Sequence, residues 1–237
     1  MSLMKELIKG KVKTVYAVDD VERVMIMYHD KVTAGNGEKE DHPVGKGEIN
    51  CAISTELFKL IKGLSIRTHH IATVGPTMLC HKVDIIPIEV VVRNIAAGSI
   101  VRQTTIEEGT VFETPLIEFY LKDDDKNDPL LTKRRLRLMG YNLSEEIEPL
   151  EQMAHDVNYK LKRIFDIIGL TLVDFKLEFG YDSHGTLLLA DELSPDGMRL
   201  WKKGTQESMD KDIFRKGDGN IVPVYQKILD NLLNISL

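Results

Sequence analysis

The strongest alternation of apolar and polar side chains in the chain runs through residues 172–180, LVDFKLEFG. Because successive side chains of a strand point to opposite faces, this pattern predicts a strand with one apolar face and one charged face. The charged face carries three side chains at alternate positions, Asp174, Lys176 and Glu178. Same-face neighbours on a strand lie about 7 Å apart, so these three form a row of fixed charges.

A turn and a returning strand follow this row. Residues 182–185 (DSHG) are typical of turns, and residues 186–190 predict the second strand of a hairpin. A loop of two or four residues places Asp191 on the face of Glu178, whereas a loop of three residues places Glu192 there. Either arrangement gives two carboxylates beside a lysine, which suits Mg²⁺ held against a polyphosphate. The alternative is the solvated face of an antiparallel sheet.

The start of the chain predicts a small antiparallel sheet. Residues 7–18 (LIKGKVKTVYAV) predict one strand that contains Gly10, with Lys11 and Lys13 on one face, and residues 23–29 predict the return strand. A glycine inside a strand often marks the close approach of a ligand, so both lysines are candidate phosphate contacts. Lysines that protect an exposed edge strand are the alternative.

Helical spacing of apolar residues predicts the helices. A glycine-rich turn at 31–37 and a polar loop as far as Gly47 precede a helix over 48–62. The longest helix is predicted from an N-cap at Ser144 to Gly169, and an amphipathic helix covers 222–233. His69 and His70 are adjacent in a probable strand and therefore face opposite ways, so we interpret them as structural or surface residues.

The middle of the chain predicts strands at 77–84 and 88–93 on either side of a bend at Ile86-Pro87, and another at 112–122. At the bend we expect the chain to leave the small sheet and enter a larger lobe. Arg93 and the following Ala-Ala-Gly-Ser, which ends at Ser99, are typical of an anion site. Ser99 as a plain helix cap is the alternative.

Composition narrows the class of protein. The 237 residues are 43% hydrophobic and 29% charged, with a net charge of −6, which disfavours a general nucleic-acid surface. The most apolar run, 85–92, is too short to span a bilayer. Cys51 and Cys80 lack metal-ligand spacing, and no signal peptide precedes them, so we expect a cytoplasmic protein without membrane or nucleic-acid partners. P-loop, G-x-G-x-x-G and nucleophile motifs are absent.

Six segments together resemble the SAICAR synthetase family, the phosphoribosylaminoimidazole-succinocarboxamide synthases. They occur in the family's order over essentially the whole chain: GKVKTVY (10–16), TAGNG (33–37), IPIEVVVRNIAAGS (86–99), LVDFKLEFG (172–180), DELSPDGMRLW (191–201) and MDKDIFR (209–215). The resemblance implies an ATP-dependent ligase that joins the carboxylate of CAIR (carboxyaminoimidazole ribotide) to the amine of L-aspartate through an acyl phosphate.

The resemblance also assigns the nucleotide side of the site. Lys11 and Lys13 correspond to ATP-phosphate contacts of a lid-like N-terminal sheet. The backbone from Lys82 to Asp84 borders the adenine at the hinge between lobes. The acidic residues of the Mg²⁺–ATP site are Glu178 and Asp191.

On the substrate side, the resemblance implies that Asp174 and Lys176 face the ribotide and its reacting carboxylate. The residues that hold the phosphate or other anionic groups of CAIR are Arg93, Ser99 and Arg199, with Lys211 and Arg215 as further contacts. Lys176, Asp174 and Arg199 are the catalytic candidates. The aspartate site is expected to border the loop that contains Lys122, Asp124 and Asp128.

Two positions depart from the family's pattern. Asn36 stands where an aspartate is common, and Ile95 stands where related sequences can carry arginine. Asn36 supplies no charge, which disfavours a metal role at that position, and Ile95 removes one anion contact.

The predicted fold is α+β with two lobes. Residues 1–85 form an antiparallel lobe with one helix, residues 86–237 form an α/β lobe, and ATP lies between them. The element pattern alone predicts only mixed α and β; the SAICAR-synthase-like fold and a homodimer are implied by the resemblance. A small-molecule kinase and a non-catalytic nucleotide-binding regulator are the competing functional hypotheses.

Overall fold

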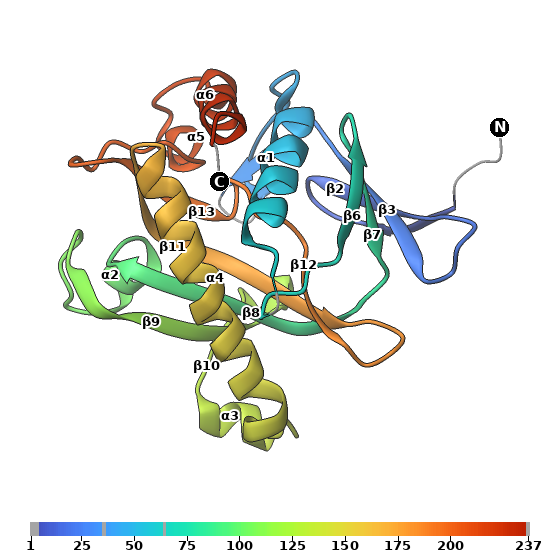
Figure 1. Cartoon of the computed structure of the whole chain (residues 1–237). Coiled ribbons are helices and arrows are strands. Elements are labelled where there is room, and N and C mark those ends of the chain that lie inside the picture. The colour runs from blue at the N-terminus through green and yellow to red at the C-terminus, as the bar shows by residue number, and fades with distance from the viewer. Residues whose placement is uncertain (1–4, 35–36, 64, 236–237) are drawn as a thin grey trace.

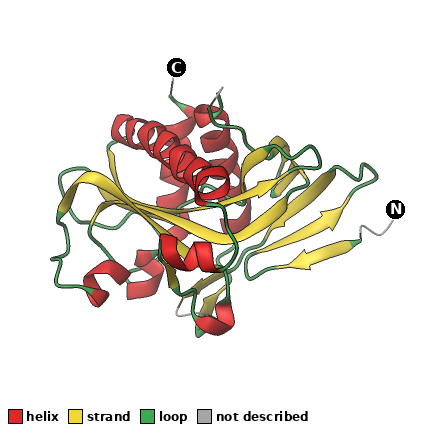
Figure 2. Cartoon of the chain, turned by 90° about the horizontal axis from the view of Figure 1, so that it is seen from below, coloured by secondary structure: helices red, strands yellow, loops and turns green. Residues whose placement is uncertain are grey.

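The computed structural model describes residues 5–34, 37–63 and 65–235, which form two main antiparallel sheets with helices beside them (Figures 1 and 2). The first sheet has five strands in the spatial order β1 (Glu6–Lys9), β2 (Lys13–Ala17), β3 (Arg23–Tyr28), β7 (Thr77–His81) and β6 (His70–Val74). A separate two-stranded sheet follows β3 in the sequence and consists of β4 (Val32–Ala34) and β5 (Lys39–Asp41).

The second main sheet has six strands and is centred on two long ones. Its order is β10 (Leu130–Leu131), β9 (Val111–Leu121), β8 (Asp84–Ile95), β11 (Leu170–Tyr181) and β12 (Leu187–Ala190), and β13 (Met198–Lys202) also pairs with β11. The helices are α1 (Lys46–Ile61), α2 (Ser99–Gln103), α3 (Lys133–Leu138), α4 (Glu148–Ile167), α5 (Asp212–Lys216) and α6 (Ile221–Leu233). This confirms the mixed α and β class.

The predicted alternation in β11 is confirmed from Asp174 to Phe179, whereas Val173 packs in a separate small cluster beside an irregularity in the pairing with β13. Phe175, Leu177 and Phe179 are at most 1% exposed and belong to the main core, and α4 lies across this face of the sheet (Figure 1). Full burial of such a side chain contributes about 1.5–3 kcal/mol. The apolar face therefore anchors the strand, and its charged side chains project from the opposite face.

The two main sheets share one hydrophobic core. All strands of the first sheet end by His81, and all strands of the second begin at or after Asp84. However, α1 packs against α6, and the core joins Leu57 to Tyr225 without a break. The division into lobes at residues 85 and 86 stays a prediction.

The N-terminal strand prediction was wrong in one respect, because residues 7–18 form two strands rather than one. The Gly10 N–H donates to the Lys13 carbonyl at 2.8 Å, which closes a turn between β1 and β2. Lys11 therefore lies in the turn and Lys13 in β2, so the two lysines do not share a strand face.

Three other local predictions are corrected. The polar loop to residue 47 contains β5 and the first two residues of α1. The long helix is capped by Asn142 rather than Ser144: the Asn142 side chain accepts N–H bonds at the start of a π-helical turn, Leu143–Ile147, that leads into α4. The Ile86-Pro87 bend lies within β8 instead of between two strands.

This bend coincides with a shift in the pairing of β8 with β11, between Glu178 and Gly180. Proline is tolerated at such bulges because it donates no ladder hydrogen bond. A Cβ on Gly180 would lie 2.7 Å from the Asp84 carbonyl oxygen, so the close approach of the two backbones requires glycine here.

The loop of the hairpin after β11 has none of the three predicted lengths of two, three or four residues. Tyr181 pairs with Leu187, which leaves five residues in the loop, and Glu178 pairs with Ala190. An odd loop of this kind places Glu192 rather than Asp191 on the face of Glu178. However, Asp191 has a φ of 60°, so the strand ends there and its regular alternation stops.

Within the described residues, no helix has the length and apolar character needed to cross a membrane.

His69 provides a test of the packing between the sheets. It is 2% exposed, with its ring edge-on to Phe58 at 5.3 Å, and burial lowers its pKa from 6.5 to about 4. The unfolded state binds a proton on His69 more readily than the folded state does. The contribution of neutral His69 to the free energy of unfolding is therefore complete above pH 6.5 and is lost as the pH falls towards 4. A shift of this size corresponds to about 3 kcal/mol.

We therefore expect the free energy of unfolding, measured in urea, to fall between pH 6.5 and pH 4, and to fall less in a His69→Gln variant. The matched control is His42→Gln, because His42 is exposed. Parallel pH profiles for wild type and His69→Gln would contradict the assignment.

Candidate active site

Two connected cavities lie on the charged side of β11. The arginine cavity has a volume of about 530 Å³ and includes Arg93, Asp174, Arg199 and Arg215 in its lining. The lysine cavity has a volume of about 460 Å³ and includes Lys13, Lys122, Glu178, Asp191 and Glu192. The shared wall between them, which we call the junction, consists of Lys11, Thr33, Glu89, Asp124, Asp128, Lys176, Asp196, Gly197 and Lys211.

The row of charges on β11 crosses from one cavity to the other. Asp174 lines the arginine cavity, Lys176 lines the junction, and Glu178 lines the lysine cavity. The Lys176 ammonium lies 2.9 Å from Glu89 Oε1 and 2.6 Å from Glu178 Oε1. Burial opposes its charge, but Glu178, Asp191 and Glu89 outweigh that effect and raise its pKa, so Lys176 acts as a fixed cation.

In the lysine cavity, lysines neutralise the acidic side chains. Lys13 Nζ lies 2.5 Å from Asp191 Oδ1 and 2.8 Å from Glu192 Oε1, and Lys122 forms an ion pair with Glu178. Burial disfavours the Asp191 charge, but Lys13 and Lys176 outweigh it and hold its pKa well below the usual range. The sequence predicted that either Asp191 or Glu192 would lie beside Glu178, depending on the loop length. Because regular strand geometry ends at Asp191, both residues line this cavity.

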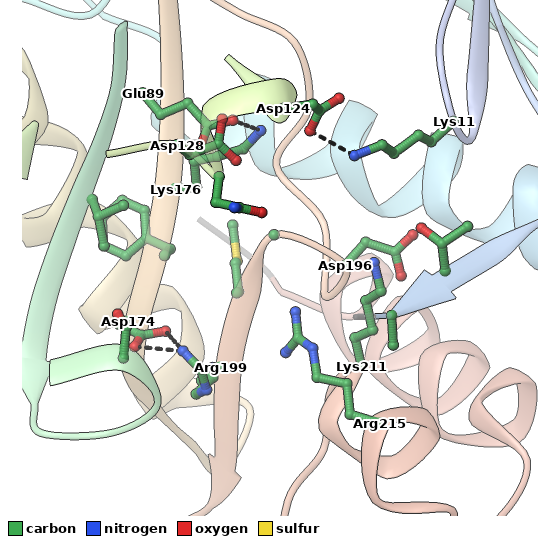
Figure 3. Close-up of a pocket in the computed structure, with 18 of the residues that line it drawn as sticks. Lys11, Glu89, Asp124, Asp128, Asp174, Lys176, Asp196, Arg199, Lys211 and Arg215 are labelled. Carbon is green, nitrogen blue, oxygen red and sulfur yellow. Dashed lines mark hydrogen bonds and ion pairs between the residues drawn. The ribbon is translucent and has the colours of Figure 1, made fainter. Parts of the chain in front are cut away.

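In the arginine cavity, Asp174 lies between two guanidinium groups. Its Oδ2 accepts from Arg93 at 2.9 Å and from Arg199 at 2.8 Å, and the side chain is 5% exposed. Arg199 Nε also donates to Asp212 at 3.1 Å (Figure 3 shows Asp174 against Arg199). Asp174 therefore orients Arg199 rather than acting as a free carboxylate.

Arg93 uses all five of its N–H groups within the protein. Its acceptors are Glu118 (2.7 Å), Asp174 (2.9 Å), the Ala97 carbonyl (3.3 Å), Ser99 Oγ (2.8 Å) and the Tyr120 hydroxyl (3.2 Å). Its side chain is 3% exposed, compared with 19% for Arg199 and 37% for Arg215. In this structure Arg93 orients its neighbours, whereas Arg199 and Arg215 are more accessible to a ligand.

The structure brings most of the candidate residues together. Those that line one or both cavities are Lys11, Lys13, Arg93, Ser99, Lys122, Asp124, Asp128, Asp174, Lys176, Glu178, Asp191, Arg199, Lys211 and Arg215. Lys82 and Asp84 are exposed and line neither cavity. Arg199 contacts Asp174 and Asp212 in the arginine cavity and does not line the lysine cavity that contains Glu178 and Asp191.

The two departures from the family's pattern lie elsewhere. Asn36 is outside the described residues. Ile95 is 9% exposed and packs in a small apolar cluster with Ala97, Val173 and Trp201, so its side chain contributes to packing.

Several cavity residues were not predicted from the sequence. Glu89 lies opposite Glu178 in the pairing of β8 with β11, a relation that only the sheet register reveals. Asp196 lines the junction and is held by Lys46 and by the Tyr225 hydroxyl at 2.9 Å. The supporting partners Glu118, Tyr120 and Asp212 were also missed, since their contacts join segments distant in the sequence.

The carboxylates fit a magnesium site that is completed by a substrate. Among the described residues, no group of three or more acidic, histidine or cysteine side chains has metal-binding geometry. Mg²⁺ is usually held by one or two carboxylates together with phosphate and water oxygens. Glu178 and Asp191 line one cavity and supply two such carboxylates, so the residues present match this mode of binding.

Comparison with known proteins identifies the family. A family model described as SAICAR synthetase matches residues 6–232. The chain belongs to this family. The phosphoribosylaminoimidazole-succinocarboxamide synthase of Staphylococcus carnosus (strain TM300) is 45% identical over 230 residues, which cover 97% of this chain and 98% of that protein.

Solved structures agree. One described as SAICAR synthetase (Type-2) in complex with ADP has a TM-score of 0.92 and 37% identity, and the match covers 97% of this chain and 98% of that one. The phosphoribosylaminoimidazole-succinocarboxamide synthase of Ehrlichia chaffeensis has a TM-score of 0.92 and 36% identity, with 98% and 100% coverage. The expected family and its fold are confirmed.

Gly98 allows Arg199 to take its position in the arginine cavity. A Cβ at Gly98 would collide with the Arg199 guanidinium, 2.6 Å from Cζ. We expect Gly98→Ala to displace Arg199 and to weaken binding of ribose 5-phosphate at least tenfold, about 1.4 kcal/mol, in isothermal titration calorimetry. Binding of ADP is expected to be unchanged.

The matched control is Gly185→Ala. Gly185 has a similar φ, +73° against +68°, but its added Cβ meets no described heavy atom within 4 Å. Equal ribose 5-phosphate affinities for the two variants would mean that Arg199 does not bind the phosphate.

Proposed function

We propose that this protein catalyses the ATP-dependent joining of CAIR and L-aspartate to give SAICAR, ADP and phosphate, a step of purine biosynthesis. The observation that carries the proposal is the row of charges on β11, which connects a lysine-rich cavity to an arginine-rich one in a member of the SAICAR synthetase family. Two adjoining anion sites are what a reaction between a nucleoside triphosphate and an anionic ribotide requires.

The chemistry is written as two displacements. A carboxylate oxygen of CAIR attacks the γ-phosphorus of ATP, the bond from that phosphorus to the β,γ-bridging oxygen breaks, and ADP leaves. The amine nitrogen of aspartate then attacks the carbonyl carbon of the acyl phosphate, and phosphate departs with the carbon–oxygen bonding pair. In the net reaction, the aspartate ammonium loses two protons: one protonates the departing phosphate, and the other is released to the solvent.

The lysine cavity is proposed as the nucleotide site. Lys11, Lys13 and Lys122 line it and would donate hydrogen bonds to the phosphate oxygens of a triphosphate. Glu178 and Asp191 would hold Mg²⁺, which, when bound, neutralises phosphate charge. We retain the backbone from Lys82 to Asp84 as the proposed border of the adenine.

The arginine cavity is proposed as the ribotide site. Arg199 and Arg215 supply guanidinium groups for the phosphate of CAIR, with Ser99 beside Arg93 as a further contact. Lys176 at the junction is positioned between the two sites and would orient the reacting carboxylate. The loop that contains Lys122, Asp124 and Asp128 remains the proposed border of the aspartate site.

Two further expectations belong to this proposal. We expect a homodimer, from the family resemblance, which size-exclusion chromatography with light scattering will test. We also place the reaction in the cytoplasm, a setting consistent with the two free, buried cysteines.

The reaction itself is tested by omission. Purified protein with ATP, Mg²⁺, CAIR and aspartate is expected to form the succinocarboxamide with one ADP per product, and omission of any one component is expected to stop product formation. Stable phosphorylated product without aspartate would indicate a kinase, and ATP binding without turnover would indicate a regulator. Either result rejects the ligase assignment.

The metal assignment is tested by Glu178→Gln and Asp191→Asn. Each change removes a carboxylate charge from the nucleotide cavity, and we expect kcat to fall about 100-fold or more, because electrostatic stabilisation of the reacting groups is lost. Glu207→Gln serves as the control, since Glu207 is exposed. A near-normal kcat in either cavity variant, with unchanged circular dichroism, would reject that residue as a metal ligand.

A further inference from the structure

Lys211 differs from the other lysines at the junction. It is the residue just before α5 (Asp212–Lys216), and its side chain borders both cavities. Figure 3 shows it beside Asp196 and Arg215, across the cavity from Glu89 and Lys176. Lys211 therefore lies between the proposed nucleotide site and the proposed ribotide site, where a phosphoryl group would be transferred from one to the other.

The neighbouring lysines are already paired with acids. Lys176 contacts Glu89 and Glu178, and Lys11 Nζ lies 2.6 Å from Asp124. For Lys211, by contrast, no ion pair or side-chain hydrogen bond to another described residue is present; its backbone N–H donates to the Pro195 carbonyl at 3.3 Å. Its ammonium donors are thus available to a ligand.

The nearest acid is already bound to other groups. Asp196 is 5% exposed, forms an ion pair with the buried Lys46, and accepts from the Tyr225 hydroxyl. Burial, together with Arg215 and Lys46, lowers the pKa of Lys211, although Asp196 opposes the shift. The folded protein therefore holds a cation here at a cost that the nearby acids offset only in part.

We propose that Lys211 is a catalytic residue that contacts the phosphoryl group while it moves from ATP to the CAIR carboxylate. The inference rests on the proposed function and adds a specific role at the junction. In the transfer, negative charge spreads over the phosphoryl oxygens as one phosphorus–oxygen bond breaks and the other forms. An ammonium group held next to those oxygens stabilises the transition state more strongly than it stabilises bound ATP or bound CAIR.

The first experiment compares Lys211→Met with Lys216→Met. Lys216 follows on the same short helix but is exposed and lines neither the arginine nor the lysine cavity. We expect Lys211→Met to lower kcat about 100-fold or more, with KM for ATP and for CAIR changed less than about threefold. Because methionine removes a half-buried ammonium that has no hydrogen-bond acceptor among the described residues, the midpoint of thermal unfolding is expected to stay the same or rise.

The second experiment locates the affected step. In rapid-quench single turnovers, Lys211→Met is expected to slow ADP formation and succinocarboxamide formation by the same factor. ADP formation at the wild-type rate would overturn the proposal, as would wild-type-like kcat, or a loss confined to the KM of one substrate.

A third variant replaces the ammonium chemically. Lys211→Cys alkylated with bromoethylamine restores a cation of nearly the same length, and the two natural cysteines are buried. We expect kcat to recover at least tenfold after alkylation; no recovery in fully alkylated, folded protein would contradict the proposal. If the wild-type protein forms no succinocarboxamide, the proposed function itself is wrong. If the wild type is active and the Lys211→Met variant is equally active, only the role of Lys211 is rejected.

Discussion

Neutralisation of the charged face of β11 is the constraint on which the rest of the site depends. Asp174 and Glu178 are each 3% exposed, and an unpaired carboxylate at that depth would cost several kcal/mol. Each is matched by two cations. Arg93 of β8 and Arg199 of β13 pair with Asp174, while Lys122, which follows β9, and Lys176 of β11 itself pair with Glu178. The ion pairs therefore permit a charged strand face inside the protein, and they also hold cations in fixed positions where anionic substrates are proposed to bind.

Interruptions of regular pairing shape the cavities. The pairing of β8 with β11 shifts between Glu178 and Gly180, and the pairing of β11 with β13 shifts between Leu172 and Asp174. At Asp191 the left-handed backbone ends β12. Such irregularities redirect side chains that an unbroken strand would send to the other face. The cavities form beside these three positions, while Phe175, Leu177 and Phe179 pack in the main core.

Sequence patterns predicted the features that are determined by residues close together in the chain. The charged row of β11 was predictable because alternation within one strand is local, and the helix over 48–62 was predictable for the same reason. The partnership of Glu89 with Glu178 was not, because it depends on the register between strands about ninety positions apart. The five-residue hairpin loop was missed because turn-forming residues fit several loop lengths.

The junction also depends on one buried ion pair that connects opposite ends of the chain. Lys46, at the start of α1, contacts Asp196 and donates to the Lys31 carbonyl at 2.8 Å, while Tyr225 of α6 donates to Asp196. Lys31 precedes the strand that carries Thr33, and Asp196 precedes Gly197; both Thr33 and Gly197 line the junction. A single ammonium thus fixes the spacing of two backbone segments that border both cavities. Asp196 is thereby held by two partners from distant parts of the chain, and it fixes the wall of the junction on which Lys211 also lies.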